Sequence, residues 1–214
     1  MNKKTVAKLI DISAVRSFST REDIIETCSI AKKYGFINVH SLPSWTLFLS
    51  ELLYDRPDIK VGAPVGFPTG GNRKEVKILE AKKLIDDGVE EMDIVMNIGK
   101  FKSGEKAYVL DEINEIISIK KSKDILTKVI IEINALSDKE ILSAAELIMK
   151  TKADYIKTGT GYIVGDTNIE RIRLIKEKTR NKIKIKAAGG IRTKKDFEEL
   201  LNLGIERFGI NTKS

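Results

Sequence analysis

The feature that most constrains the fold of this chain is a repeated alternation between short apolar segments and longer amphipathic segments. The short segments are rich in β-branched residues, and some, such as the Val-Ile-Ile-Glu-Ile stretch that begins at Val129, are almost continuously apolar. Such runs are typical of parallel strands that are covered on both faces. We therefore predict strands at residues 6–13, 36–42, 60–67, 91–97, 128–134, 154–157, 183–187 and 207–210.

The segments between these strands carry helix start and stop signals. Thr20 precedes acidic residues that suit a helix N-terminus, and Ser137 opens a capping box. Residues 74–87 place apolar side chains close to a 3.6-residue period, and Gly88 follows as a stop. Further helices are predicted at residues 141–149, 167–178 and 193–203.

Strand alternating with helix in this way predicts one α/β domain over residues 1–214, with the (β/α)8 TIM-barrel fold. A doubly wound open sheet is the alternative, but the Gly-x-Gly-x-x-Gly motif expected after its first strand is missing. The chain stops at Ser214, soon after the last predicted strand, so we expect the C-terminal helix to be truncated. Another helix or a neighbouring subunit would then cover that side, which makes a homo-oligomer plausible.

Composition narrows the classes of partner and compartment. No apolar run approaches the roughly 18 residues of a membrane span, and no signal peptide is evident at the N-terminus. One cysteine, Cys28, allows no intrachain disulfide, which fits a reducing, cytoplasmic location. The net charge of +7 is scattered among 31 acidic residues, so we expect no nucleic-acid partner. A modest positive field would still help to collect a phosphorylated substrate.

Two lysines end successive predicted strands, and each precedes small residues. A charged ammonium at Lys157 or Lys186 would lose its hydration in a buried strand. Two such groups within ~4–6 Å would lower one pKa, and the neutral amine could then form a Schiff base with a carbonyl. Asp93 is the carboxylate best placed to move protons. The alternative is that each lysine is a solvated or ion-paired residue at a strand end.

Other polar or small residues also follow the predicted strands. The backbone N–H groups of Gly189 and Gly190 could bind phosphate, although glycines there could equally serve tight turns. His40 is the single histidine, and it has no cluster of further ligands around it in the sequence. We therefore expect neither a metal nor another cofactor. Further strand-end candidates are Asp11, Asn97, Asn134, Asn211 and Thr212.

At these residues the chain resembles the deoxyribose-phosphate aldolases, a class I aldolase family with a barrel fold. The most specific motifs are Lys-Thr-Gly-Thr-Gly from Lys157 and Lys-Ala-Ala-Gly-Gly-Ile-Arg-Thr from Lys186. The matching segments run almost end to end, at residues 8–11, 31–36, 65–68, 75–81, 88–99, 129–132, 153–161, 186–193 and 207–209.

The resemblance implies a reaction and a role for each matching residue. The family cleaves 2-deoxyribose 5-phosphate reversibly to glyceraldehyde 3-phosphate and acetaldehyde, without a metal. By resemblance, Lys157 is the Schiff-base nucleophile, Lys186 lowers its pKa, and Asp93 relays protons. Asp11 would support the lysine pair. The residues expected to bind substrate or its phosphate, together with Asp11, are Ser13, Gly161, Gly189, Gly190, Asn211 and Thr212.

Departures from the family pattern concentrate at the rim. His40 stands where the family has a cysteine, and Gly159 stands where many members have serine. Ser13 replaces a threonine, and Asn211-Thr212 replaces a serine pair. Aldolase chemistry is therefore better supported than the particular sugar. The alternatives are the same lysine chemistry on a different sugar phosphate or aldehyde, and a non-catalytic barrel that binds a sugar phosphate.

Overall fold

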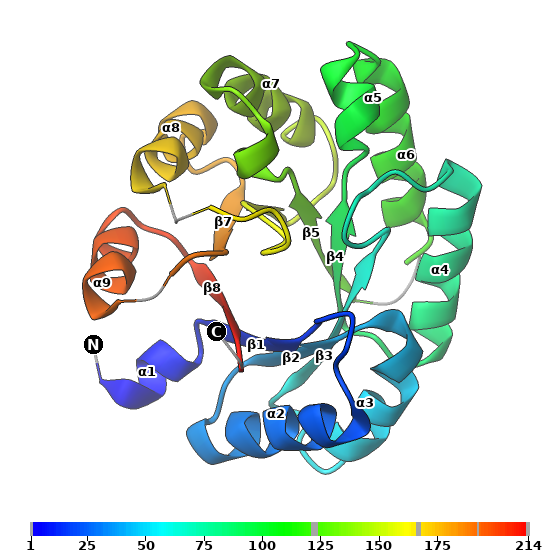
Figure 1. The fold of residues 1–214 in the computed structure, drawn as a ribbon, viewed down its shortest axis with the longest axis vertical. Helices are drawn as coiled ribbons and strands as arrows, with labels where there is room; N and C mark the ends of the chain where they lie inside the picture. Colours follow the sequence, from blue (N-terminus) through cyan, green and yellow to red (C-terminus); the bar gives the residue numbers. More distant parts are fainter. Residues whose placement is uncertain (1, 121–123, 166–167, 192, 213–214) are drawn as a thin grey trace.

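The protein forms a closed barrel of eight parallel strands in sequence order, surrounded by helices (Figure 1). The computed structural model describes residues 2–120, 124–165, 168–191 and 193–212. The barrel closes where β1 pairs with β8 in parallel, which confirms the predicted TIM-barrel fold. The strands are β1 (Ile10–Ala14), β2 (Asn38–Ser41), β3 (Lys60–Val65), β4 (Glu91–Val95), β5 (Leu126–Ile130), β6 (Tyr155–Lys157), β7 (Lys184–Ala188) and β8 (Arg207–Asn211).

Helices follow the strands and form the outer layer of the barrel (Figure 1). The predicted capping box at Ser137 is present, and Thr20 and Thr193 form capping boxes as well. Each box satisfies backbone N–H groups that the first helical turn leaves unpaired. The helices are α1 (Lys3–Ala7), α2 (Arg21–Tyr34), α3 (Thr46–Leu53), α4 (Lys74–Asp86), α5 (Ile98–Lys102), α6 (Lys106–Ser118), α7 (Asp138–Ile148), α8 (Ile169–Thr179) and α9 (Lys194–Asn202), with 3-10 turns η1 (Pro43–Trp45) and η2 (Ile133–Ala135).

The largest corrections to the predicted strand boundaries concern two strands. Residues 6 and 7 belong to helix α1, which Asn2 caps by accepting from the backbone N–H of Thr5, so the first strand begins only at Ile10. The strand predicted at 128–134 ends at Ile130, and Glu132 adopts a left-handed backbone with φ of 54°. The predicted start of a helix at residue 167 lies outside the described residues. In Figure 1, α1 lies between α9 and α2 in the outer ring.

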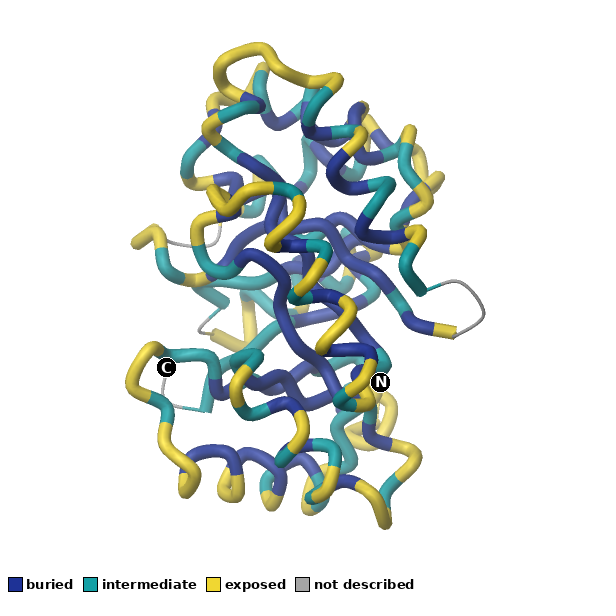
Figure 2. The backbone as a smooth tube through the Cα atoms, turned by 90° about the vertical axis from the view of Figure 1, so that its right-hand side faces the viewer, coloured by how far each residue is buried: buried dark blue, intermediate teal, exposed yellow. Residues whose placement is uncertain are grey.

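Strand β4 sends apolar side chains outward to the helices and charged ones into the barrel. On β4, Met92 and Ile94 belong to the large apolar cluster that runs from β3 round to β8 and includes residues of α4 to α9. A second cluster joins β1, β2, α2 and α3. Figure 2 shows the buried backbone concentrated along the strands, with exposed segments on the outside. The alternate residues Glu91 and Asp93 are also buried, so the barrel interior is charged rather than apolar.

No helix in the described part of the chain is long and apolar enough to cross a membrane.

Candidate active site

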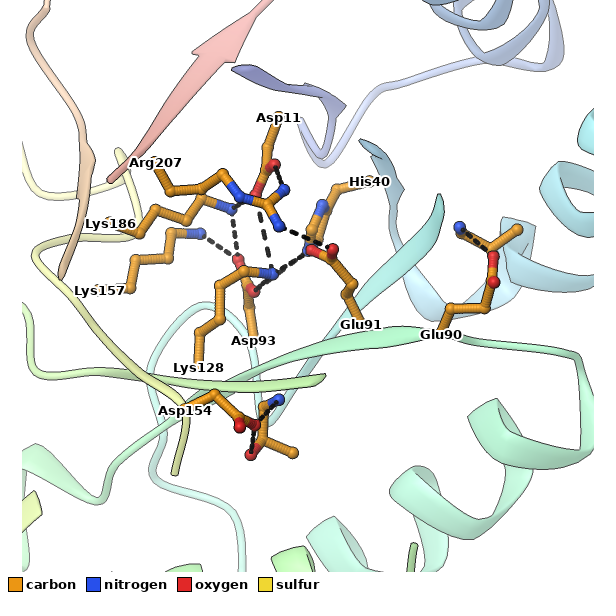
Figure 3. A network of polar contacts seen from close by, with 12 residues as sticks. Asp11, His40, Glu90, Glu91, Asp93, Lys128, Asp154, Lys157, Lys186 and Arg207 are labelled. Atoms are coloured by element: carbon orange, nitrogen blue, oxygen red, sulfur yellow. Dashed lines mark hydrogen bonds and ion pairs between the residues drawn. The ribbon is translucent and has the colours of Figure 1, made fainter. Parts of the chain in front are cut away.

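Asp93 lies at the centre of the charged barrel interior and is fully buried. Its Oδ2 atom accepts from the Nζ atoms of Lys157 and Lys186, each at 2.9 Å. Its Oδ1 atom accepts from Nζ of Lys128 at 3.1 Å. Figure 3 shows these side chains converging from β4, β5, β6 and β7. The structure therefore brings the two predicted lysines together through the predicted carboxylate.

The register of the sheet explains why the two lysines meet. Lys157 on β6 pairs directly with Lys186 on β7, so both side chains point to the same face of adjacent strands. The Lys186 side chain is 2% exposed, whereas that of Lys157 is 12% exposed. Of the two side chains, that of Lys157 is therefore the more accessible.

The environment of Lys157 lowers its pKa from 10.5 to about 8. Burial is the largest cause, because desolvation disfavours the charged ammonium. The cations of Lys186 and Lys128 act in the same direction, and the Asp93 carboxylate opposes them. Of the two effects expected from the sequence, burial lowers the pKa of Lys157 more than repulsion from Lys186 does.

Three residues of this network were not predicted. Lys128 and Glu91 form a buried ion pair, and Nη2 of Arg207 lies 3.1 Å from Oε1 of Glu91. Arg207 also contacts Asp11 at 2.5 Å, and Asp11 lies 2.6 Å from Nζ of Lys186. The available signal was a charged residue within a strand for Lys128 and at the first position of a strand for Glu91 and Arg207.

The cations determine the charge state of the two buried aspartates. Burial by itself would raise the pKa of Asp93 and of Asp11. For Asp93, the three lysines, together with His40 in the acid range where its ring is protonated, outweigh burial and hold the pKa well below its usual range. For Asp11, Lys186, Lys128 and Arg207 do the same, so its pKa is also lowered. Both groups are therefore carboxylates at neutral pH.

A cavity of about 270 Å³ lies at the carboxyl ends of the strands and reaches the lysines. Gly161, Gly189 and Gly190 line it with positive φ angles of 79°, 90° and 77°. A Cβ atom on Gly189 would lie 3.8 Å from Cα of Gly161, so the two loops approach closely. The predicted glycines therefore gather at one side of the cavity and expose backbone to it.

The remaining predicted rim residues divide into two groups. Ser13 and Asn211 line the cavity, and the Ser13 hydroxyl donates to the carbonyl of Ile210 at 3.0 Å. Thr212 does not line the cavity; its backbone N–H donates to the Ser13 carbonyl at 3.4 Å. Its place is thus at the closing seam between β8 and β1.

The cavity is also lined by residues that were not predicted from the sequence. Tyr162 donates its hydroxyl to the carbonyl of Val15 at 2.9 Å and packs edge-on against Phe67, with ring centroids 5.1 Å apart. Arg16 and Glu132 also line the cavity. Oε2 of Glu132 accepts from the backbone N–H of Thr160 at 3.0 Å and so holds the loop after Lys157. Only the position of Tyr162, directly after Gly161, gave a signal in the sequence.

No group of three or more His, Cys, Asp or Glu side chains that could hold a metal ion occurs among residues 2–120, 124–165, 168–191 and 193–212. The carboxylates that meet inside the barrel are instead occupied by lysine and arginine.

Comparison with known proteins places this site in a family. Residues 59–209 match the model of the DeoC/LacD family aldolases. The chain is 41% identical to a deoxyribose-phosphate aldolase of Sinorhizobium medicae, over 98% of this chain and 84% of that protein. It is 36% identical to the enzyme of that name from Thermococcus kodakarensis, over 99% and 95%.

Solved structures agree with the sequence comparison. A protein described as QR15, an aldolase, superposes with a TM-score of 0.90 at 34% identity, over 97% of this chain and 91% of that one. The tetrameric deoxyribose phosphate aldolase from Aeropyrum pernix superposes with a TM-score of 0.89 at 26% identity, over 98% and 88%. With its barrel, its buried lysine pair and these relatives, the chain belongs to the DeoC/LacD family of aldolases.

Proposed function

We propose that this protein is a class I, Schiff-base aldolase that cleaves 2-deoxy-D-ribose 5-phosphate reversibly to D-glyceraldehyde 3-phosphate and acetaldehyde. The observation that carries the proposal is the position of Lys157. Its amine has a pKa of about 8, reaches the cavity, and lies 2.9 Å from a carboxylate that a second lysine also contacts. The relatives named deoxyribose-phosphate aldolase support the choice of substrate.

The first half of the reaction forms the covalent intermediate. The neutral amine of Lys157 attacks the aldehyde carbon of the open-chain sugar, and loss of water, with uptake of one proton from solvent, leaves a protonated imine. Asp93 accepts a proton from the attacking amine and returns it to the departing hydroxyl, since its Oδ2 atom lies within hydrogen-bonding distance of Nζ. Lys186 lies 2.6 Å from Asp11 and 2.9 Å from Asp93, and its cation disfavours protonation of Lys157.

The second half breaks the carbon–carbon bond. The hydroxyl on C3 loses its proton to a base, the C2–C3 electron pair moves into the imine, and glyceraldehyde 3-phosphate leaves. The resulting enamine takes a proton at C2, and water then hydrolyses the imine to release acetaldehyde and free Lys157. No net oxidation occurs, so the chemistry needs no redox cofactor.

The phosphate of the substrate would bind at the glycine side of the cavity. Gly161, Gly189 and Gly190 offer backbone there, and Arg16 adds a cation to the same cavity. Asn211 and Ser13 lie on the neighbouring strands and suit hydroxyl recognition. In this arrangement the phosphate binds at the rim of the cavity, and the carbon–carbon bond is cleaved at its inner end.

A different aldehyde or sugar phosphate is the second candidate, and Gly159 favours it. A Cβ atom there would lie 3.0 Å from Oε1 of Glu132 and 3.3 Å from the carbonyl of Ala188. A serine could occupy this position only if its neighbours moved, so the hydroxyl common in the family is missing from the cavity wall. Relative kcat/KM values for a panel of phosphorylated and unphosphorylated aldehydes would decide between the two substrates.

The decisive experiment is borohydride trapping with substrate. Reduction should fix one substrate-derived adduct on Lys157, which peptide mass spectrometry would locate. Lys157→Ala should give no adduct and lower the rate on the order of 10³-fold or more. Lys184→Ala, which removes an exposed lysine from strand β7, is the matched control and should behave as wild type. An adduct elsewhere, or turnover by Lys157→Ala, would refute the mechanism.

Homo-oligomerisation and a cytoplasmic location are also proposed. A tetrameric relative of known structure supports the first, and the single cysteine supports the second. Light scattering on the purified protein tests the oligomer, because a monomeric mass would contradict it.

A further inference from the structure

His40 is a buried titratable residue that the mechanism above does not use. It lies on β2, is 3% exposed, and places Nε2 3.2 Å from Oδ1 of Asp93 (Figure 3). The approach is close but oblique, since the contact falls short of good hydrogen-bond geometry. Catalytic hydrogen bonds are often long or poorly aligned in the absence of substrate. The imidazole therefore faces the oxygen of Asp93 that does not contact Lys157.

The neighbouring strand leaves room for this ring at Gly62. Gly62 on β3 pairs directly with His40. A Cβ atom on Gly62 would lie 2.4 Å from Cε1 and 2.5 Å from Nδ1 of the imidazole. Any side chain at position 62 would displace the ring, so His40 and Gly62 form a complementary pair.

Asn38 completes the surroundings of the ring. It precedes His40 by two residues on β2, so both side chains share one face. Its Oδ1 atom lies 2.8 Å from the same point at which a Gly62 Cβ would stand. The amide N and O atoms of Asn38 and Nδ1 of His40 are buried and have no hydrogen-bond partner among the described residues. Buried polar groups of this kind are normally paired, directly or through a water molecule.

The charges around His40 come from four strands. Asp93 on β4 and Asp11 on β1 are the anions, and Lys128 on β5 and Lys186 on β7 are the cations. Burial, and then the two lysines, lower the pKa of His40 to about 4, against the attraction of Asp93. The ring is neutral near pH 7, and a neutral imidazole has one donor nitrogen and one acceptor nitrogen.

We infer that His40 is a positioning residue for Asp93. As a neutral imidazole it directs Nε2–H at Oδ1 of Asp93, while the Asn38 amide group keeps Nδ1 as an acceptor. Oδ2 of Asp93 then remains directed at Lys157 and Lys186, so one oxygen serves proton transfer and the other is held. This role rests on the proposed function only in that Asp93 moves protons for Lys157.

The first test reads the tautomer directly and needs no substrate. His40 is the only histidine, so a two-dimensional ¹H–¹⁵N spectrum of the full chain contains one set of imidazole signals. We expect the Nε2–H pattern, unchanged between about pH 5 and 8, and a shift toward a tautomer mixture in Asn38→Leu. The Nδ1–H pattern, or a titration near the ordinary pKa of 6.5, would overturn the inference.

The second test separates positioning from mere packing. His40→Leu should lower kcat about tenfold or more with little change in KM. His40→Gln restores an amide donor at similar reach and should recover part of that loss. An unchanged kcat in both variants would overturn the inference. The same loss of kcat in both variants would overturn it as well. If His40→Leu does not fold, the Asn38→Leu spectrum still decides.

Borohydride trapping separates this inference from the proposed function. A wild-type adduct on Lys157 combined with unchanged kcat in His40→Leu overturns the role of His40 alone. The absence of an adduct in wild type refutes the aldolase mechanism, whatever the tautomer of His40.

Discussion

At the scale of single residues, Lys157 owes its low pKa first to its place in the barrel and then to its neighbours. Burial disfavours its ammonium form, and Lys186 and Lys128 add repulsion. Asp93 works in the opposite direction because it stabilises the charged form. The balance leaves the amine with a pKa of about 8, low enough for a useful neutral fraction at neutral pH.

The rate of imine formation should therefore depend on pH in a defined way. Only the neutral amine attacks, so the rate should rise with pH through about 8 and level off above it. Single-turnover trapping at a series of pH values measures this rise in the rate of imine formation. A flat profile between about pH 6 and 9 would contradict the assigned pKa.

Removal of Lys186 should shift the rise in the rate of imine formation to higher pH. Lys186→Met deletes one cation beside Lys157 and also leaves Asp93 freer to stabilise its ammonium form. Both effects raise the pKa of Lys157, by about one unit as an order of magnitude. The control is Lys184→Met on the same strand, where the side chain is exposed. If the rate of imine formation in Lys186→Met rises over the same pH range as in wild type, burial alone sets the pKa of Lys157.

At the scale of the elements, a buried ion pair ties helix α4 to helix α6 behind the active-site strands. Lys77 and Glu112 are both fully buried, with Nζ 2.9 Å from Oε2. Nζ of Lys77 also donates to the carbonyl of Val95, at the end of β4. Nearby, Glu80 of α4 accepts from the backbone N–H of Gly66 at 2.6 Å, directly before Phe67 of the cavity mouth. Helix α4 therefore positions one wall of the cavity.

Breaking that pair should destabilise the protein more than replacing it. Lys77→Met leaves Glu112 buried without its partner and should reduce the free energy of unfolding by about 3–5 kcal/mol. The loss should shrink at lower pH, because burial already raises the pKa of Glu112 and protonation removes the unpaired charge.

Urea unfolding of the single and double variants checks this prediction. Lys77→Met combined with Glu112→Leu should recover most of the stability, and Lys82→Met, on the exposed face of α4, should change little. A double variant as unstable as the sum of its single changes would contradict the assignment of the loss to an unpaired charge.

At the scale of the whole molecule, barrel closure places charged side chains from six strands in a buried interior. Arg207 on β8 contacts Asp11 on β1 and Glu91 on β4. Ion pairs therefore link strands across the barrel, in addition to the hydrogen bonds between neighbouring strands. Such an interior makes the stability of the barrel sensitive to acid, because protonation of its anions leaves cations without partners.

Acid should destabilise the protein in two stages. Folding lowers the pKa of His40 from 6.5 to about 4. As the pH drops through that interval, the unfolded state binds a proton before the folded state does, so the free energy of unfolding declines. The slope should be about 1.4 kcal/mol per pH unit at most. Below about 4 the lowered pKa values of Asp11 and Asp93 add a further loss, since the unfolded carboxyls are protonated first.

Urea unfolding at a series of pH values measures both stages. His40→Gln should remove the first, and Asp86→Asn, an exposed change on α4, should remove neither. Constant stability between pH 6.5 and 4 in wild type would contradict the neutral, buried state of His40.

The sequence by itself determined the order of the elements, the barrel, and the three central residues Lys157, Lys186 and Asp93. Those inferences depend on local signals: apolar runs, helix caps, and charges at the ends of strands. The same signals misplaced the first strand, because the Asn2 cap draws residues 3–7 into a helix. Distinctive motifs also placed the chain in its family.

Only the tertiary structure decided which charges meet. Lys128, Glu91 and Arg207 join Asp11 because barrel closure brings β1, β4, β5 and β8 around one interior, and spacing along the chain does not reveal contacts across it. The same holds for His40, whose ring reaches Asp93 because Gly62 on the adjacent strand leaves space for it. Residue types thus set the chemistry available, and the closed sheet determined which groups are desolvated together and hence their charge states.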